Sequence, residues 1–397
     1  MLIDILWGNY NDNRRKVMSK WILMPDSFKG TMSSQEICQI MRDALLCHVP
    51  DAEIVSIPVA DGGEGSVDAF LTAVGGHRVV VECTGPDFRK VTGFYGLLSD
   101  SYTAVIEMAA AAGLPLMEGR LCAEGATTYG VGELILAAIQ DGAKRIILGL
   151  GGSATNDGGC GCAAALGVRF LDGAGDAYIP VGGTLDRLCR IDISRRTPLL
   201  EGVEIVAMCD VDNPLCGPSG ASAVFGPQKG AGPDMVAKLD RNLWNLSEVI
   251  RQDLGMEIAD TPGAGAAGGM GAGVMAFLGS RLQMGIETVL DTVGFDDKLP
   301  GTTAVLTGEG RIDGQSLRGK VVVGIAHRAR KAGVPVIAVV GDVAPGAERA
   351  YQEGVTAIVS TNRRAVPWEV ACQSAKADLY AALEDLFRLY NAFRTSK

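Results

Sequence analysis

The sequence has few of the residues that bind zinc. Its 397 residues include only three histidines, and none of its ten cysteines forms a C-x-x-C pair, the closest two being Cys160 and Cys162. This shortage argues against a zinc site. In a long chain without a secretory signal we expect the cysteines to be reduced, mostly buried small residues, which favours a cytoplasmic protein.

Long apolar runs and a positive net charge are missing as well. No window approaches the roughly 18 continuous apolar residues that a membrane-spanning helix needs, so a soluble protein is expected. The net charge of −10 argues against nucleic acid and anionic membranes as partners. An anionic substrate must therefore be met by positive charge that is concentrated at one site.

The first residues do not form a signal peptide. Their apolar stretch at 2–7 is short, contains Asp4 and precedes the basic residues rather than following them. Because the first predicted strand starts only after a second methionine, Met18, we expect residues 1–17 to be a disordered extension or the result of an upstream start assignment.

Two nucleotide-binding patterns are present only in part. Residues 263–268 have the spacing of a dinucleotide fingerprint, but residues 258–262 before them contain an acid and a proline instead of a buried strand. Residues 314–320 match most of a Walker A loop, yet Val321 stands where the magnesium-binding Ser or Thr belongs. Neither pattern supports its usual function, although Lys320, at the start of a predicted helix, can still meet phosphate.

The sequence does contain a regular alternation of strands and helices at both ends. A capping box formed by Ser33 and Glu36 begins a helix after a strand at 21–24, and a strand at 54–59 precedes a helix at 66–74. Near the other end, strands at 304–306, 335–340 and 357–360 are followed by helical segments at 321–332, 347–353 and 368–390. Such alternation predicts parallel strands with helices on both faces.

The middle of the chain is different. Between 79 and 294 glycine is more frequent, strands are less regularly followed by helices, and a long amphipathic helix at 233–254 stands apart. The chain also exceeds the usual length of one core, so two domains are expected. We predict a discontinuous α/β domain with a parallel sheet, residues 18–80 and 295–397, and a second mixed α/β domain inserted at 81–294.

Polar residues gather where several predicted strands end. The most informative cluster is Gly151-Gly-Ser-Ala-Thr-Asn-Asp-Gly-Gly159, directly after an apolar strand at 145–150. Backbone N–H groups of a glycine-rich turn can converge on an anion. A plain tight turn would explain the glycines, but not the polar side chains among them, Ser153, Thr155, Asn156 and Asp157. We therefore predict a binding site in this segment.

Further motifs of the same kind occur along the chain. A predicted strand precedes each of Asp26-Ser-Phe-Lys-Gly30, Ala60-Asp-Gly-Gly-Glu-Gly65 and Cys209-Asp-Val-Asp-Asn-Pro-Leu215. Later come Phe225-Gly-Pro-Gln-Lys-Gly230, the glycine run at 263–269, and Thr307-Gly-Glu-Gly-Arg-Ile-Asp-Gly314 leading to Gly319-Lys320. In this order the seven motifs closely resemble those of the bacterial glycerate kinases that form 2-phosphoglycerate. The resemblance extends from about Met18 to the C-terminal helix.

The resemblance implies a fold and a reaction. The implied fold is a discontinuous flavodoxin-like or Rossmann-like domain with an inserted mixed α/β domain, and the active site lies in the cleft between them. The implied reaction is ATP-dependent phosphorylation of D-glycerate at its 2-hydroxyl, with magnesium and by in-line transfer. The residues alone support an anion-binding α/β enzyme. They leave two alternatives open: an NAD-dependent hydroxy-acid oxidoreductase and a non-catalytic anion-binding protein.

Kinase chemistry needs cations around the transferred phosphoryl group, carboxylates for magnesium, and a base near the acceptor hydroxyl. The candidate cations all lie in motifs that contain glycine: Lys29, Lys229, Arg311 and Lys320. The candidate magnesium ligands are Asp61, Glu64, Glu309 and Asp313. Magnesium usually takes only one or two protein carboxylates, and Asp61 and Glu64 are as well suited to stabilising a turn or a helix start.

Three aspartates are candidates for activating the substrate hydroxyl: Asp210, Asp157 and Asp26. Each follows a predicted strand, where side chains of α/β sheets project toward a ligand, and the sequence does not rank them. Ser153, Thr155, Arg311 and the amides of Gly151 and Gly152 are the predicted contacts of the substrate carboxylate. Asn156, Asn213, Lys229 and Lys320 complete the predicted substrate- and phosphate-binding set, and Lys29 joins the aspartates as a catalytic candidate.

Overall fold

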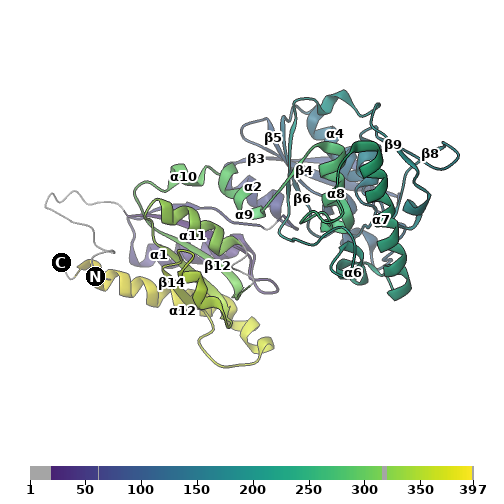
Figure 1. Ribbon diagram of the computed structural model, residues 1–397. Coiled ribbons are helices and arrows are strands. Elements are labelled where there is room, and N and C mark those ends of the chain that lie inside the picture. The colour runs from purple at the N-terminus through teal and green to yellow at the C-terminus, as the bar shows by residue number, and fades with distance from the viewer. Residues whose placement is uncertain (1–18, 61, 315–319, 396–397) are drawn as a thin grey trace.

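The computed structural model describes residues 19–60, 62–314 and 320–395. Two lobes, each built around a β-sheet, are visible in Figure 1. The extension expected at 1–17 and the candidate ligand Asp61 lie outside the described residues. None of the described helices combines the length and the apolar character that crossing a bilayer requires.

The first sheet consists of five parallel strands in the order β14-β13-β12-β1-β2. Their bounds are β1 (Lys20–Pro25), β2 (Glu53–Ser56), β12 (Thr302–Ile312), β13 (Val336–Val343) and β14 (Ala357–Ser360). The sheet therefore combines strands from both ends of the chain. The parallel pairing predicted from the alternation of strands and helices is confirmed.

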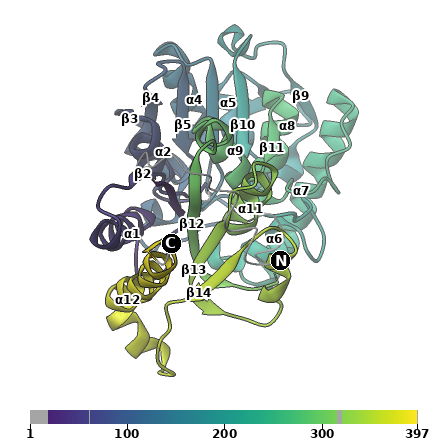
Figure 2. The same cartoon turned by 90° about the vertical axis from the view of Figure 1, so that its left-hand side faces the viewer.

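Helices cover both faces of the first sheet. On one face lie α1 (Ser34–His48) and α12 (Trp368–Thr395), whose apolar side chains share a core with Trp21 and Leu23, and Figure 2 shows these two helices side by side. On the other face lie α9 (Gly285–Thr292), α10 (Phe295–Lys298) and α11 (Val321–Lys331). The capping box is also confirmed, because Ser33 accepts from the Glu36 N–H and the Glu36 carboxylate accepts from the Ser33 N–H.

The second sheet is mixed, with the order β11-β10-β6-β5-β4-β3. Its strands are β3 (Gly76–Thr84), β4 (Lys90–Leu98), β5 (Thr103–Glu107), β6 (Arg145–Gly149), β10 (Glu204–Met208) and β11 (Arg281–Gln283). The last four run parallel, whereas β3 and β4 are antiparallel to their neighbours. A small antiparallel sheet has the order β8-β7-β9. It is made of β7 (Arg169–Leu171), β8 (Ala177–Tyr178) and β9 (Arg190–Asp192).

The helices of the middle of the chain surround these two sheets. They are α2 (Ser66–Val74), α3 (Ala109–Ala112), α4 (Tyr129–Gln140), α5 (Cys160–Ala165), α6 (Ala221–Phe225), α7 (Pro233–Leu254) and α8 (Ala266–Leu278). Short 3-10 helices are η1 (Leu114–Met117), η2 (Gly182–Arg187), η3 (Pro198–Leu200), η4 (Pro227–Lys229) and η5 (Ala347–Tyr351). The bounds of α2 and α7 are those expected from the sequence. The segment expected to be helical at 347–353 is the 3-10 helix η5.

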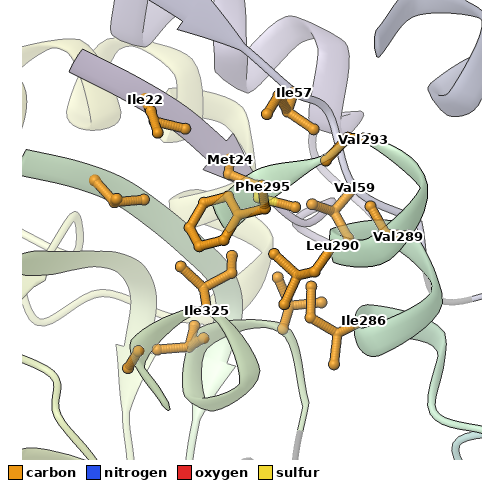
Figure 3. Close-up of a cluster of buried hydrophobic side chains, with 14 of the residues drawn as sticks. Ile22, Met24, Ile57, Val59, Ile286, Val289, Leu290, Val293, Phe295 and Ile325 are labelled. Atoms are coloured by element: carbon orange, nitrogen blue, oxygen red, sulfur yellow. The ribbon is translucent and has the colours of Figure 1, made fainter. Parts of the chain in front are cut away.

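One hydrophobic core joins the two lobes. It contains Ile22 and Met24 of the first sheet together with Ile147 and Met208 of the second. Helices α2 and α9 lie between the sheets (Figure 1) and contribute to this core. Figure 3 shows Phe295 of α10 among Met24, Leu290 and Ile325. The domain boundaries at residues 80 and 294 stay a prediction, since β3 crosses the first of them and the core crosses both lobes.

Candidate functional site

Two glycine motifs from different sheets make direct backbone contact. The Gly151 N–H donates to the Gly62 carbonyl at 3.0 Å. A Cβ atom on Gly151 would lie 2.5 Å from the Gly63 Cα, and one on Gly149 would lie 2.4 Å from the Gly62 carbonyl oxygen. Any side chain at these positions would force the two backbones apart, so glycine is required. The turn that follows β2 therefore rests on the loop that follows β6.

The same turn is connected to the edge of the first sheet. The Val59 N–H donates to the Pro25 carbonyl at 3.1 Å, and the next residue, Asp26, donates its N–H to the Gly308 carbonyl at 2.8 Å. A Cβ atom on Gly310 would lie only 3.5 Å from the Phe28 Cα. The motifs that contain Asp26, Lys29 and Glu309 therefore lie at one edge, the carboxyl ends of β1 and β12. Asp26 is half-buried, Lys29 is exposed and Glu309 is 7% exposed.

Lys229 is buried beneath the loop that follows β6 and donates hydrogen bonds to it. Its Nζ donates to the Ser153 Oγ at 2.8 Å and to the Thr155 carbonyl at 2.6 Å. The side chain is 1% exposed. Burial lowers the pKa of Lys229 to about 7, although the Asp157 carboxylate acts in the opposite direction. A cation predicted from sequence to meet phosphate thus lies beneath the predicted binding loop.

The loop also presents buried polar atoms that the described residues leave without a hydrogen bond. These are Thr155 Oγ1 and Asn156 Oδ1, both in residues with no exposed surface. The Asn156 Nδ2 does have a partner, since it donates to the Ser222 Oγ at 3.1 Å. Buried polar atoms normally have partners. Their unused hydrogen-bonding capacity is therefore typical of a loop that acquires partners when it binds a ligand or water.

Asp157 is fully buried at the start of two helices. Its Oδ2 accepts from the N–H and the hydroxyl of Thr128, each at 2.8 Å, and from the Gly161 N–H at 3.2 Å, while Oδ1 accepts from the Gly159 N–H at 3.1 Å. Burial raises the pKa of Asp157, and these hydrogen bonds act against the rise. A carboxylate with four donors and no exposed surface is suited to fixing α4 and α5 beneath the loop. This geometry favours a positioning role for Asp157 over that of a base.

The glycine run at 263–269 forms a kink instead of a dinucleotide-binding turn. Ala267, Gly268 and Gly269 have positive φ values of 55°, 69° and 89° inside α8. A Cβ atom on Gly268 would lie 2.0 Å from the Thr155 carbonyl oxygen. The Gly158 N–H donates to the Gly268 carbonyl at 3.1 Å. The run therefore lets α8 approach the predicted binding loop, which accounts for the glycines without a nucleotide.

Asp210 lies two residues after the end of β10, the strand next to β6. The pairing of Met208 with Gly149 brings the two strand ends together. The side chain of Asp210 is exposed, and its Oδ1 accepts from the Gly285 N–H at 2.7 Å at the start of α9. A helix N-terminus favours the negative charge of a carboxylate. Asn213, further along, donates to the Ser219 carbonyl at 2.8 Å and so fixes the turn.

The other predicted residues are more peripheral. Arg311 is exposed, and its guanidinium lies 3.5 Å from the Asp342 carboxylate on the neighbouring strand. Lys320 is exposed at the N-cap of α11, Asp313 is half-buried after β12, and Glu64 is exposed before α2. The described contacts do not join Arg311 to the Gly151 loop.

Oxygen ligands for magnesium are present, but they form no complete cluster among the described residues. No three His, Cys, Asp or Glu side chains of residues 19–60, 62–314 and 320–395 converge as a metal site. Magnesium usually keeps several waters and takes one or two carboxylates. Asp26 and Glu309, on neighbouring strand ends, supply carboxylates of the required chemistry.

Three residues that support the candidate site were not predicted from the sequence. Thr128 donates to the Asp157 carboxylate, and Ser222 accepts from the Asn156 amide. Glu107 caps α2 by accepting from the Val67 N–H at 2.7 Å. Glu107 ends β5 and is 3% exposed, and its burial raises the pKa of the carboxyl group. Its place at a strand end is the signal that identified Asp157 and Asp210, so the sequence offered a means of finding it. For Thr128 and Ser222 it offered none.

Comparison with known proteins agrees with this arrangement. The sequence pattern of the glycerate kinase family matches residues 21–391. A glycerate kinase of Bacillus cereus is 45% identical over 91% of this chain and 95% of its own, and a glycerate 2-kinase of Escherichia coli is 46% identical over 86% and 90%. A crystal structure from Salmonella typhimurium LT2, assigned as a glycerate kinase 2, has a TM-score of 0.84 with 40% identity. It matches 95% of this chain and 99% of its own. The chain belongs to the glycerate kinase family.

Proposed function

We propose that this protein transfers the γ-phosphoryl group of ATP to the 2-hydroxyl of D-glycerate, forming 2-phospho-D-glycerate and ADP. The observation that carries the proposal is the backbone contact between Gly62 and Gly151. It joins the carboxyl ends of both sheets at one place, and ligands of α/β proteins bind at such strand ends. Membership of the glycerate kinase family supports the reaction.

The loop after β6 is the proposed site of the glycerate carboxylate. The hydroxyl of Ser153 and the amide of Gly152 supply donors, and the buried Lys229 side chain lies behind the loop. The Gly151 amide, a predicted contact of the carboxylate, already donates to the Gly62 carbonyl. Thr155 Oγ1 and Asn156 Oδ1 supply further hydrogen-bonding capacity. A hydroxy acid bound here has both a charged group and a hydroxyl to recognise. This combination of donors and acceptors fits such a ligand better than a simple anion.

Asp210 is the proposed base that takes the proton of the substrate hydroxyl. It is exposed at a strand end adjacent to the loop and is held by the start of α9. Asp26 is the alternative, and Asp157 is less suitable because four donors occupy it. A base must reach the substrate proton, and the exposure of Asp210 and the partial exposure of Asp26 support that role better than the complete burial of Asp157.

Magnesium and ATP are proposed at the edge formed by β1 and β12. The carboxylates of Glu309 and Asp313 are the proposed metal ligands there, and Asp26 joins them if Asp210 is the base. Asp61, a candidate ligand from the sequence, lies outside the described residues. Bound magnesium neutralises charge on the phosphates during in-line transfer. Lys29 and Lys320 are the proposed cationic contacts of the phosphate chain, since both are exposed in motifs at this edge.

The proposal is tested by incubating the purified chain with ATP, magnesium and D-glycerate and measuring ADP. Enolase, which accepts 2-phosphoglycerate but not 3-phosphoglycerate, then identifies the position of the phosphate. Controls omit glycerate, replace it with L-glycerate, or replace ATP with NAD. Failure to form ADP above the glycerate-free control, or a product that enolase accepts only after addition of a phosphoglycerate mutase, contradicts the proposal.

A further inference from the structure

The second sheet ends in a long, exposed edge strand. β3 has nine residues, and its register with β4 runs without a bulge from Gly76 to Thr84. In the part of the chain that the structure describes, β4 is its only strand partner. The strand contains no proline, and Val80 is 63% exposed. Natural proteins usually protect such an edge with a bulge, a proline or a short strand, because it otherwise pairs with another chain.

The free side of β3 can be located from the hydrogen bonds at its two ends. Gly85 donates to the Arg89 carbonyl at 2.7 Å, and Ser99 donates to the Gly75 carbonyl at 3.2 Å. In antiparallel strands the hydrogen-bonded pairs alternate, so the odd-numbered residues of β3 bond to β4. The even-numbered residues, including Arg78, Val80 and Glu82, consequently direct their N–H and C=O groups away from the sheet.

The side chains on this edge complement a second copy of themselves. If two copies of β3 pair antiparallel about Val80, Val80 meets its own counterpart, and Arg78 of one copy lies opposite Glu82 of the other. Arg78, Val80 and Glu82 then all fall in hydrogen-bonded pairs, as do the other even-numbered residues of β3, which gives reciprocal bonds along the whole segment. Opposite charges directly across a strand pair are favourable. A two-fold interface requires this self-complementarity.

The charges on this strand are placed for such a contact. Glu82 is exposed and forms no ion pair within the described protomer. The Arg78 guanidinium has its Nη2 at 2.5 Å from the Asp68 carboxylate and its centre 4.1 Å from the Phe94 ring centroid. Arg78 is still 40% exposed. It can therefore contact a second carboxylate without a change in the fold.

We propose that β3 is a dimer interface, at which two copies of this chain join their second sheets into one continuous sheet through antiparallel β3–β3 pairing centred on Val80. The two central pairs of charges are Arg78 of each protomer with Glu82 of its partner. The odd-numbered face of β3 is covered within each protomer, because Val79 and Val81 pack against the core beneath α4. The inference is independent of the proposed reaction, and its test requires no substrate.

Three substitutions at exposed positions test the interface. Val80→Lys places two ammonium groups opposite each other. In Glu82→Arg, the substituted side chain and Arg78 of the partner are both positive and lie opposite each other. In Arg78→Glu, the substituted side chain and Glu82 of the partner are both negative and lie opposite each other. Analytical ultracentrifugation of the full chain over about two decades of concentration is expected to show a wild-type dimer. Each variant is expected to raise the dimer Kd by at least about tenfold. Circular dichroism and thermal melting verify that the variants fold.

Mixing the two charge variants tests the proposed charge pairs more directly. The Glu82→Arg chain carries two arginines at these positions, and the Arg78→Glu chain carries two glutamates, so each opposes itself but complements the other. An equimolar mixture, with one chain isotopically labelled, is expected to form heterodimers in native mass spectrometry. A wild-type chain that stays monomeric, dimers that Val80→Lys leaves unchanged, or a mixture without preferred heterodimers would each overturn the proposal.

Discussion

The buried ammonium of Lys229 makes a quantitative prediction about stability. The pKa of Lys229 is about 7 in the folded protein, because burial removes water from the charge, and its ordinary value is 10.5. Below pH 7 the side chain is charged in both the folded and the unfolded chain, so the folded state bears the full cost of burying the charge. As the pH rises from 7 toward 10.5, the folded state releases the proton while the unfolded state keeps it. The unfolded state then binds more protons, and stability rises with pH.

The size of this effect follows from the two pKa values. Between pH 6 and pH 8 the folded state loses most of this proton and the unfolded state keeps it, which corresponds to an unfolding free energy on the order of 1 kcal/mol. Lys229→Met keeps a similar volume but removes the titrating group. The variant should therefore lack this part of the pH dependence. Over this interval the difference in unfolding free energy between wild type and variant should change in favour of wild type by an amount on the order of 1 kcal/mol.

The measurement is urea unfolding of both proteins at pH 6, 7 and 8, followed by tryptophan fluorescence. Because the titrating groups that do not interact with Lys229 are common to both proteins, their contributions cancel in the difference. Nuclear magnetic resonance of proteins labelled at the lysine side chains gives a direct titration midpoint, and the signal absent from Lys229→Met identifies the residue. A midpoint near 10, or parallel pH profiles of the two proteins, would refute the reasoning.

Three further predictions concern the active site. Asp210→Asn should lower kcat by about 10² to 10⁴ and leave the melting temperature unchanged, and a near-normal kcat would favour Asp26 as the base. Asp157→Asn should instead lower the melting temperature, because an amide cannot accept from all four donors. Gly151→Ala should destabilise the protein by about 1 to 3 kcal/mol and reduce kcat/KM, because its Cβ would contact the Gly63 backbone. Gly232→Ala, where the added Cβ meets nothing within 4 Å, is the matched control, and equal behaviour of the two variants would count against the contact. Chelation should abolish turnover and magnesium restore it, and turnover that persists in excess chelator would exclude a metal requirement.

The elements of this fold were more predictable than their assembly. Local signals suffice for a helix such as α1, whose capping box and apolar spacing lie within its own residues. They also suffice for the parallel direction of the strands in the first sheet, which the strand–helix alternation predicts, but not for the choice of β12 as the partner of β1. The core that joins the two lobes is different, because Met208 and Phe295 share no local pattern with Ile22. Such contacts depend on packing between distant segments.

Within the site, the sequence predicted which side chains follow a strand end, but it did not predict how buried each of them is. Asp157 and Asp210 follow neighbouring parallel strands and look equivalent in sequence. In the structure one has no exposed surface and the other is exposed. Thr128, which is itself buried and lies 29 positions before Asp157, provides two of its four donors. A side chain's solvent exposure is decided by residues that sequence spacing does not associate with it.

The glycines show why motif spacing needs a structural context. The run at 263–269 has the spacing of a dinucleotide fingerprint, yet its glycines serve the approach of α8 to Thr155. Gly62 and Gly151 are part of no such fingerprint, and they bring the two sheets into hydrogen-bonding contact. In both cases the missing Cβ matters because a second backbone occupies its place. At these positions the glycines are therefore required by backbone packing around the site, and the polar side chains between them supply the proposed chemistry.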